Sequence, residues 1–367
     1  MTERLAGLSM LGMVGDLSGP SLWRCLQPFS ALERRGYPAH WDFKDARGIG
    51  LLAPRYDAIL LSRLAWPPER RRLAEAWFSM LRRAGKLVVY DCDDDVFTSE
   101  LSRRSLALGL ADGKSYAELE AERLERVWAL RQCDGVTVST RRLATVVRGI
   151  TDRPVVVVPN AIDLHWFRRV LRSAPRRLPA PTIGWSGGRR PDDDLEQVAV
   201  AWGRIAARFP DVRFVVGGYL PPVVASHVPA ERLVTVPWLP LDRYPAGIRD
   251  VDIACCSVAN TPFNRSKSAI KAYEAAVAGA AVVATPTVYG GLVQHGVTGL
   301  LAETADEWES ALADLLEHPA RRAILARRLL RVVEREHSLE GQLWRWPSAW
   351  AAIRDDALSR RGRLVAV

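Results

Sequence analysis

Residues 261–286 read TPFNRSKSAIKAYEAAVAGAAVVATP and contain, in order, a polar turn, a helical stretch and an apolar run. We predict that the helix begins near Ser266 or Ser268 and ends at Gly279, because glycine commonly follows the last residue of a helix. The apolar run after Gly279 is typical of a buried strand. A helix that leads directly into a buried strand is the repeating unit of a parallel α/β sheet.

The same alternation of short apolar runs and longer amphipathic stretches extends along both halves of the chain. In the first half it predicts strands near 5–14, 37–43, 56–63, 86–91, 134–139 and 155–159, with helices over 21–36, 68–85 and 116–133. In the second half it predicts strands near 182–186, 212–217, 233–237, 252–257 and 280–285, with helices near 192–208, 242–249, 267–278, 305–317 and 319–335. We therefore expect an α/β protein with two Rossmann-like, doubly wound domains.

The stretch FRRVLRSAPRRLPAP, residues 167–181, holds three prolines and five arginines and indicates an exposed connector between the two domains. A last helix near 340–358 contains Pro347, which should kink or restart it. The predicted parts are an acceptor-side domain over 1–170, a linker over 171–180, a donor domain over 181–340 and a C-terminal helix, 341–367, that packs back toward the first domain. Ligands of such sheets bind at the carboxyl ends of the strands, so we expect the function at a cleft between the domains.

The composition is that of an ordinary soluble globular protein, with 48% hydrophobic and 25% charged residues in 367. The longest apolar runs are far shorter than the roughly 20 residues that a membrane-spanning helix needs, and the N-terminal stretch has no cleavage site, so we expect a cytoplasmic protein. The five cysteines show no metal-ligand spacing. A net charge of +9 favours an anionic partner, which can be a nucleotide, a phospholipid surface or a nucleic acid.

Within the opening stretch, Lys267, Lys271 and Glu274 follow one another at steps of four and three. On the predicted helix this spacing puts them on one face, with two cations beside the helix N-terminus, which suits a diphosphate. Glu274 could then accept hydrogen bonds from sugar hydroxyls. The alternative interpretation is a solvated helix face with a Lys271–Glu274 ion pair.

Five segments in the expected order resemble a family 4 retaining glycosyltransferase of the GT-B fold, a group 1 glycosyltransferase of the kind common in bacterial surface-polysaccharide synthesis. They are SLWRCLQPFSALERRG (21–36), KLVVYDCDDDVF (86–97), VPNAIDLHWF (158–167), PTIGWSGGRRPDDDLEQV (181–198) and the region from FNRSKSAIKAYEAAVAG to AVVATPTVYGGLVQHGVTGLLA (263–302). One departure is that Ser266 stands where such enzymes commonly carry the first of two glutamates spaced eight apart, while Glu274 matches the second.

The resemblance implies that Glu274 holds the ribose of a nucleotide-sugar donor and that Lys271, Lys267 or Arg265 balances its pyrophosphate. It also implies transfer with retention of anomeric configuration. Cations at the bridging oxygen would stabilise the departing nucleoside diphosphate more than the bound donor, so Lys271 is also a candidate catalytic residue.

In each domain, one glycine-containing loop follows the first predicted strand. In GWSGGRR, residues 184–190, Gly187 and Gly188 would let backbone N–H groups approach a phosphate, and Arg189 would add charge. By analogy, the loop from Gly15 through Gly19 to Ser21 would lie near the sugar. The alternative for the later loop is a plain turn that Asp192 caps.

The run YDCDDDVF places aspartates at 91, 93, 94 and 95, at the carboxyl end of a predicted strand. Crowded carboxylates raise a pKa or require cations nearby. We predict that Asp93 or Asp94 meets the acceptor hydroxyl or a sugar and that the others cap the following turn. Metal binding by such a run is the alternative, but it belongs to the other major glycosyltransferase fold, so we expect no metal and no other cofactor.

The predicted function is therefore metal-independent transfer of a sugar from a UDP-, GDP- or dTDP-sugar to an acceptor glycan, including a lipid-linked one. The alternatives are a nucleotide-sugar epimerase or hydrolase on the same scaffold, or a basic nucleic-acid-binding protein, which the scattered arginines disfavour. Arginines on predicted N-domain helices suggest peripheral association with an anionic membrane, and the alternative interpretation is a solvated helix surface. The arginines are Arg34, Arg35, Arg70, Arg71, Arg72, Arg82 and Arg83.

Overall fold

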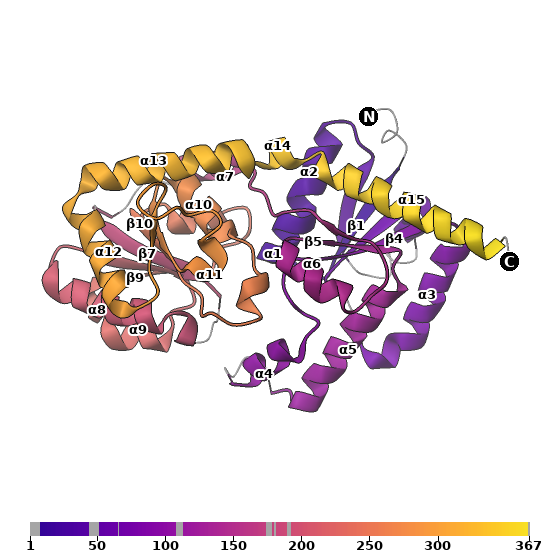
Figure 1. Cartoon of the computed structure of the whole chain (residues 1–367), viewed down its shortest axis with the longest axis horizontal. Coiled ribbons are helices and arrows are strands. Elements are labelled where there is room, and N and C mark those ends of the chain that lie inside the picture. The colour runs from indigo at the N-terminus through magenta and orange to yellow at the C-terminus, as the bar shows by residue number, and fades with distance from the viewer. Residues whose placement is uncertain are drawn as a thin grey trace. The chain divides into compact units, whose positions relative to one another are not determined.

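The computed structural model describes residues 8–43, 51–64, 66–107, 113–173, 178–179, 181–188 and 192–365 (Figure 1). The chain divides into two compact units. Unit 1 comprises Met1–Asn160, Ser266–Ser268 and Leu339–Val367, and unit 2 comprises Ala161–Arg265 and Ala269–Ser338. The division between them falls after Asn160, ten residues before the predicted linker at 171–180.

Unit 1 is built on a six-stranded parallel sheet with the order β2-β1-β3-β4-β5-β6. The strands are β1 (Met10–Val14), β2 (Ala39–Phe43), β3 (Ala58–Ser62), β4 (Leu87–Cys92), β5 (Gly135–Val138) and β6 (Val155–Val157). Its helices of at least eight residues are α2 (Gln27–Arg34), α3 (Arg71–Arg83), α4 (Ser99–Ala107), α5 (Tyr116–Gln132), α6 (Arg141–Arg148) and α15 (Arg345–Val365), and two short ones are α1 (Gly19–Ser21) and α14 (Leu339–Gln342). Because β1 leads to β2 on one side and β3 lies on its other side, the direction of winding reverses at β1.

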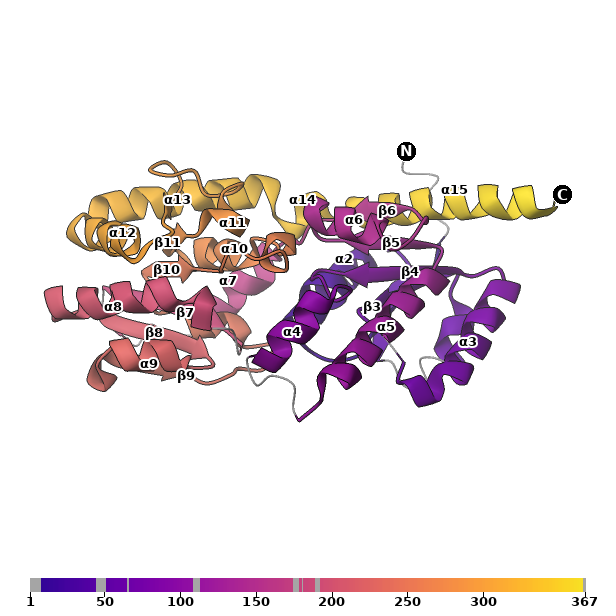
Figure 2. The ribbon, with the colours of Figure 1, turned by 60° about the horizontal axis from the view of Figure 1, so that its bottom comes forward.

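The C-terminal helix α15 belongs to unit 1, where it lies along the sheet (Figure 2). Pro347 is the third residue of the helix, where its missing N–H group costs no hydrogen bond, so the proline allows a new helix to begin at Arg345. Trp346, Trp350 and Ile353 are buried. A Cβ atom on Gly135 of β5 would lie 2.5 Å from Ile353, so this glycine lets the helix pack directly on the strand.

Unit 2 contains a second six-stranded parallel sheet with the order β12-β11-β10-β7-β8-β9. The strands are β7 (Thr182–Gly187), β8 (Arg213–Gly218), β9 (Leu233–Val236), β10 (Ile253–Cys256), β11 (Ala281–Ala284) and β12 (Leu300–Leu301). The helices are α7 (Leu164–Ser173), α8 (Glu196–Arg208), α9 (Pro222–His227), α10 (Ile270–Ala278), α11 (Pro286–Tyr289), α12 (Ala305–Glu317) and α13 (Pro319–Glu336), and the site also uses the 3₁₀ turns η5 (Asp192–Asp194), η7 (Tyr244–Ile248) and η8 (Asn264–Ser266).

Alternate residues along the strands of unit 2 point to opposite sides of the sheet. Ile183, Trp185, Ile253 and Cys255 join the core that α8 and α12 cover. α10 connects β10 to β11 and packs against both of them. The chain reverses its winding at β7, so the switch point of this sheet lies between β7 and β10.

The fold class predicted from the sequence, α/β with two Rossmann-like, doubly wound halves, is confirmed. The prediction of an exposed connector over 167–181 is wrong for its first part, because α7 continues to Ser173 and buries Phe167, Val170 and Leu171. These three residues have helical spacing that the intervening arginines obscure in the sequence. In the described part of the chain, no helix combines the length and the apolar character that crossing a bilayer requires.

Candidate functional site

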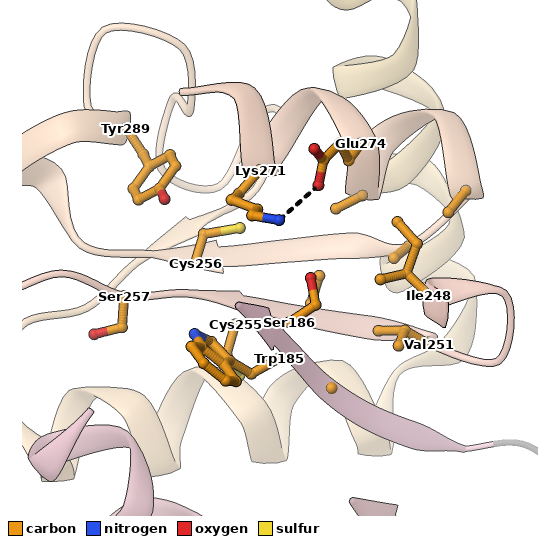
Figure 3. Close-up of a pocket in the computed structure, with 15 residues that line it drawn as sticks. Trp185, Ser186, Ile248, Val251, Cys255, Cys256, Ser257, Lys271, Glu274 and Tyr289 are labelled. Carbon is orange, nitrogen blue, oxygen red and sulfur yellow. Dashed lines mark hydrogen bonds and ion pairs between the residues drawn. The ribbon is translucent and has the colours of Figure 1, made fainter. Parts of the chain in front are cut away.

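A pocket opens in unit 2 at the switch point between β7 and β10 (Figure 3). Trp185 and Ser186 of β7 and the end of β10 form one side of it, and α10 forms the other with Lys271 and Glu274. Ile248 of η7 and Tyr289 also line it. The pocket is thus placed where ligands of doubly wound sheets bind, and it contains two of the predicted site residues.

The helix that carries these two residues begins later than predicted. α10 starts at Ile270, and Lys267 lies in the turn between η8 and the helix. The prediction that Lys267, Lys271 and Glu274 share one helical face is therefore wrong. Asp194 holds η8 and the loop before it, because its Oδ1 accepts hydrogen bonds from the Asn264 side-chain amide at 2.7 Å and from the Ala259 backbone at 2.8 Å.

Lys271 and Glu274 form a compact group with Tyr244. The Tyr244 hydroxyl donates to Glu274 Oε2 at 2.6 Å, Lys271 Nζ lies 3.2 Å from the same oxygen, and Lys271 also donates to the Tyr244 hydroxyl. Glu274 is 1% exposed, so the alternative of a solvated helix face is wrong, although the ion pair that it assumed is present. The Lys271 side chain is 24% exposed and is accessible to an anion.

The second oxygen of Glu274 is in a different situation. Oε1 is buried, and no hydrogen-bond partner for it exists among the described residues. A buried acceptor without a partner is costly, so it favours a ligand that brings a hydrogen-bond donor. The pocket therefore combines a cation with an acceptor that a sugar hydroxyl could satisfy.

Glycines line the ends of β7 and β8 beside this pocket. Gly187 ends β7 and is buried, Gly188 follows it, and Gly218 has a positive φ of 91°. A Cβ atom on Gly218 would lie 2.5 Å from the Gly187 carbonyl oxygen, so the two backbones can approach this closely only because residue 218 has no side chain. The predicted donor-binding residue Arg189 lies outside the described residues.

Asp194 is a positioning residue that the sequence analysis missed. It is buried, and in addition to the two hydrogen bonds of its carboxylate, its carbonyl oxygen accepts one from the Ser257 hydroxyl at 2.6 Å. It thereby ties the loop after β10 to η5. The sequence signal was the run of three aspartates at 192–194, but nothing in that run distinguishes the buried member from the others.

The remaining predicted cations lie apart from the pocket lining. Arg265 is exposed and donates through Nε to Asn260 at 2.8 Å. Lys267 belongs with unit 1, where its Nζ lies 3.4 Å from Asp94 Oδ1. Among the described cations that were predicted to face the donor, only Lys271 lines the pocket.

Two of the four aspartates at 91–95 have structural roles. Asp91 is fully buried, pairs with the buried Arg24 at 2.7 Å and accepts from Thr137 at 2.6 Å. Asp95 accepts hydrogen bonds from the backbone N–H groups of Phe97 and Thr98, at 3.2 and 3.1 Å. The prediction that part of the run caps the following turn is confirmed for Asp95.

Asp93 has the properties of a titrating group. The pKa of Asp93 is raised to about 6, mainly by burial and secondly by the negative charge of Asp94. The positive charge of Arg63 lowers this pKa but does not cancel the increase. The Arg63 guanidinium lies 3.6 Å from Asp93 Oδ1. Arg63 also adopts a φ of 55°, a strained value for a residue with a side chain, which the fold retains at the carboxyl end of β3.

The loop after β1 is organised by Asp16. Its Oδ1 accepts from the Ser18 backbone at 3.0 Å and from the Ser21 hydroxyl at 3.1 Å. Gly15 is exposed at the end of β1, and Gly19 is the first residue of α1. Both predicted glycines therefore lie at the carboxyl end of β1, at the switch point of unit 1.

Across the described part of both units, no three His, Cys, Asp or Glu side chains are grouped as metal ligands.

Comparison with known proteins gives a family match in the second half of the chain. Residues 180–318 match the family model described as glycosyl transferases group 1. The chain is also 29% identical over 224 residues to a 2-deoxystreptamine glucosyltransferase of Streptomyces kanamyceticus, a match that covers 56% of this chain. The chain spans about half, 53%, of the length of that relative. The predicted resemblance to group 1 glycosyltransferases is thus confirmed for this part of the chain.

Solved structures that are similar to this chain align with both of its units. A sucrose-phosphate synthase from Thermosynechococcus elongatus aligns with a TM-score of 0.64 and 14% identity, over 95% of this chain and 99% of that one. HepE from Anabaena, in complex with UDP, aligns with a TM-score of 0.59 and 15% identity, over 94% and 100% of the two chains. At this identity the likeness shows the fold, that of GT-B glycosyltransferases.

Proposed function

We propose that this protein is a glycosyltransferase that moves a sugar from a nucleoside-diphosphate sugar to an acceptor hydroxyl. The observation that carries the proposal is the pocket of unit 2, where a partly exposed lysine lies beside a buried glutamate, one oxygen of which has no partner in the described part of the chain. This pocket lies within the stretch that matches the group 1 family model. The resemblance of the whole sequence to GT-B enzymes supports the same function.

The two side chains have separate tasks in this proposal. Lys271 offsets the negative charge that builds on the diphosphate as the bond to the sugar breaks, and Glu274 accepts a hydrogen bond from a ribose hydroxyl. Stabilisation that grows as charge develops lowers the barrier and not only the binding free energy. Gly187 and Gly188 leave room for a phosphate near the backbone.

We further propose retention of anomeric configuration and a reaction without a metal ion, on the sequence resemblance alone. In the front-face route, the acceptor oxygen bonds to the anomeric carbon as the bond to the diphosphate breaks. The acceptor proton passes to the departing phosphate oxygen, and the bonding electron pair leaves with the nucleoside diphosphate. The proposed setting is surface-polysaccharide or glycoconjugate synthesis in the cytoplasm.

The relatives suggest which donor to test first. The curated relative is named a glucosyltransferase, and HepE has been solved with UDP and with UDP-glucose. We therefore propose UDP-glucose as the first donor, with GDP- and dTDP-sugars as the alternatives. We also propose that the acceptor is lipid-linked and that the arginines on the helices of unit 1 contact an anionic membrane.

Thermal unfolding in the presence of UDP, GDP or dTDP tests the donor site. A nucleotide at 100 times its dissociation constant should add about 2.7 kcal/mol to the free energy of unfolding. Incubation of the matching nucleotide sugar with a panel of lipid-linked and soluble glycans should then give a glycosylated product whose anomeric configuration is read by NMR. No stabilisation by any of the three nucleotides, or release of free sugar or an epimer without transfer, would overturn the proposal.

A further inference from the structure

The group formed by Tyr244, Lys271 and Glu274 contains one member that the proposed reaction does not yet use. Tyr244 begins η7, and its hydroxyl reaches α10 across 27 and 30 residues of sequence. It donates to Glu274 Oε2 and accepts from Lys271, while the Lys271 ammonium lies 4.9 Å from the centre of its ring. The phenol thus contacts both residues that are proposed to bind the donor.

Lys271 has two competing tasks in this arrangement. In the structure it is one of two donors to Glu274 Oε2, but to balance a diphosphate it must direct its ammonium toward the ligand. Each step of that movement weakens the charge pair with Glu274, which is 1% exposed. A buried carboxylate that loses its partner pays a desolvation penalty, and this penalty would be subtracted from the affinity for the phosphates.

Tyr244 can remove this conflict. Its hydroxyl lies 2.6 Å from Glu274 Oε2 and is neutral, so an arriving anion attracts it less strongly than it attracts the Lys271 ammonium. The ligand itself can satisfy the other oxygen, Oε1, which is buried without a partner among the described residues. With both oxygens satisfied in this way, Lys271 is released to the diphosphate at little cost.

We propose that Tyr244 is a positioning residue of the donor pocket, which keeps Glu274 hydrogen-bonded while Lys271 moves from the carboxylate to the donor diphosphate. The inference rests on the proposed function of the pocket. Such a role distinguishes ligands with phosphates from ligands without them, which a purely structural role would not do. Tyr244 should matter for ligands that carry phosphates and should matter little for the nucleoside alone, because only phosphates require Lys271 to leave.

The test compares UDP with uridine by isothermal titration calorimetry on the full chain. In Tyr244→Phe, we expect the dissociation constant for UDP to rise roughly tenfold, because one hydrogen bond to a charged group is lost. The dissociation constant for uridine should change by less than about twofold on the same scale. Tyr116→Phe, which removes an exposed phenol hydroxyl on α5 of unit 1, is the matched control and should change neither value.

A second measurement isolates the coupling to Glu274. Glutamine has nearly the shape of glutamate and no charge, so in a Glu274→Gln background Lys271 is no longer held by a buried carboxylate. The tenfold effect of Tyr244→Phe on UDP should then shrink to about twofold or less in the double-mutant cycle. Near-ultraviolet circular dichroism and thermal unfolding of each variant show that the fold is retained.

The outcomes separate the inference from the function on which it rests. If wild-type protein binds UDP but Tyr244→Phe loses UDP and uridine equally, or loses neither, Tyr244 does not release Lys271 and the inference fails alone. If the tyrosine effect persists undiminished in the Glu274→Gln background, the inference also fails. If wild-type protein binds none of UDP, GDP and dTDP, the proposed function fails and the inference falls with it.

Discussion

The two sheets have related winding, yet their carboxyl ends carry opposite chemistry. In unit 2, Glu274 receives hydrogen bonds from Tyr244 and Lys271 on one oxygen. In unit 1, Asp93 lies 3.6 Å from the Arg63 guanidinium and beside the like charge of Asp94, so burial and repulsion raise its pKa to about 6. The first carboxylate therefore accepts hydrogen bonds from a phenol and an ammonium, while the second is buried with a raised pKa and can exchange a proton near pH 6.

This difference indicates that the two units bind different substrates. The partly exposed Lys271 suits an anionic ligand, whereas a carboxylate with a raised pKa suits contact with a hydroxyl. The donor is thus expected at unit 2 and the acceptor at unit 1. Variants that act on one carboxylate but not on the other test whether the two carboxylates have these separate roles.

The largest effect is expected at Lys271. In Lys271→Met the rate of sugar transfer should fall by about 100- to 1,000-fold, because the charge that balances the departing diphosphate is lost. The free energy of unfolding should fall by about 1–3 kcal/mol, because the buried Glu274 loses one of its two donors, and the protein should stay folded because Tyr244 still donates to it. Lys114→Met, which removes a lysine paired with Glu122 in unit 1, is the matched control and should keep full activity. An unfolded Lys271 variant, or one with normal transfer, would assign the Lys271–Glu274 pair to stability instead.

A smaller effect, about 2–3 kcal/mol, is expected from Asp93 through pH. Because the folded-state pKa of about 6 lies above the ordinary value of 3.8, the folded protein holds the proton more tightly than the unfolded chain. This group therefore contributes stability that is present below pH 4 and is lost as the pH rises through 6. Asp93→Asn should lack this loss, so its stability relative to wild type should increase between pH 4 and pH 7 in urea unfolding.

The rate of sugar transfer by Asp93→Asn should also differ from wild type in its dependence on pH. If the ionised Asp93 contacts the acceptor, wild-type transfer should rise with pH through about 6, and Asp93→Asn should be roughly tenfold slower and without that rise. Asp94→Asn should move the midpoint to lower pH, because it removes the neighbouring like charge. A pH profile that is identical in wild type and Asp93→Asn would remove Asp93 from the site.

The neighbouring Asp95 should behave as a cap with a modest effect. Asp95→Ala should lower the free energy of unfolding by about 1 kcal/mol, since two backbone N–H groups lose their acceptor. Asp95→Asn should be nearly silent, because asparagine is also a good capping residue. Transfer rates that fall tenfold in the Asn variant would instead place Asp95 in the acceptor site.

The sequence predicted much of this arrangement because periodicity and motifs are local. The pair Lys271–Glu274, the glycines at the ends of β1 and β7, and all described strands except the two-residue β12 are each predicted from a single short segment. Tyr244 was missed because no spacing relates it to α10, and its role exists only after η7 and α10 pack together. Likewise, nothing in the run of aspartates shows that Asp91 pairs with Arg24, which is 67 residues distant in sequence, while Asp93 lies beside Arg63.

The smallest expected effect is that of removing divalent metal ions. If Lys271 offsets the charge of the diphosphate in unit 2, a metal ion has no electrostatic task left there. In unit 1, Asp91 and Asp95 are already occupied by Arg24 and by backbone N–H groups, so the run cannot offer all of its carboxylates to a cation. Transfer should therefore continue unchanged in excess EDTA, in wild type and in Asp93→Asn alike. Activity that EDTA abolishes and Mn²⁺ restores in wild type, but that Mn²⁺ cannot restore in Asp93→Asn, would make Asp93 a metal ligand and would reverse the division of labour between the two carboxylates.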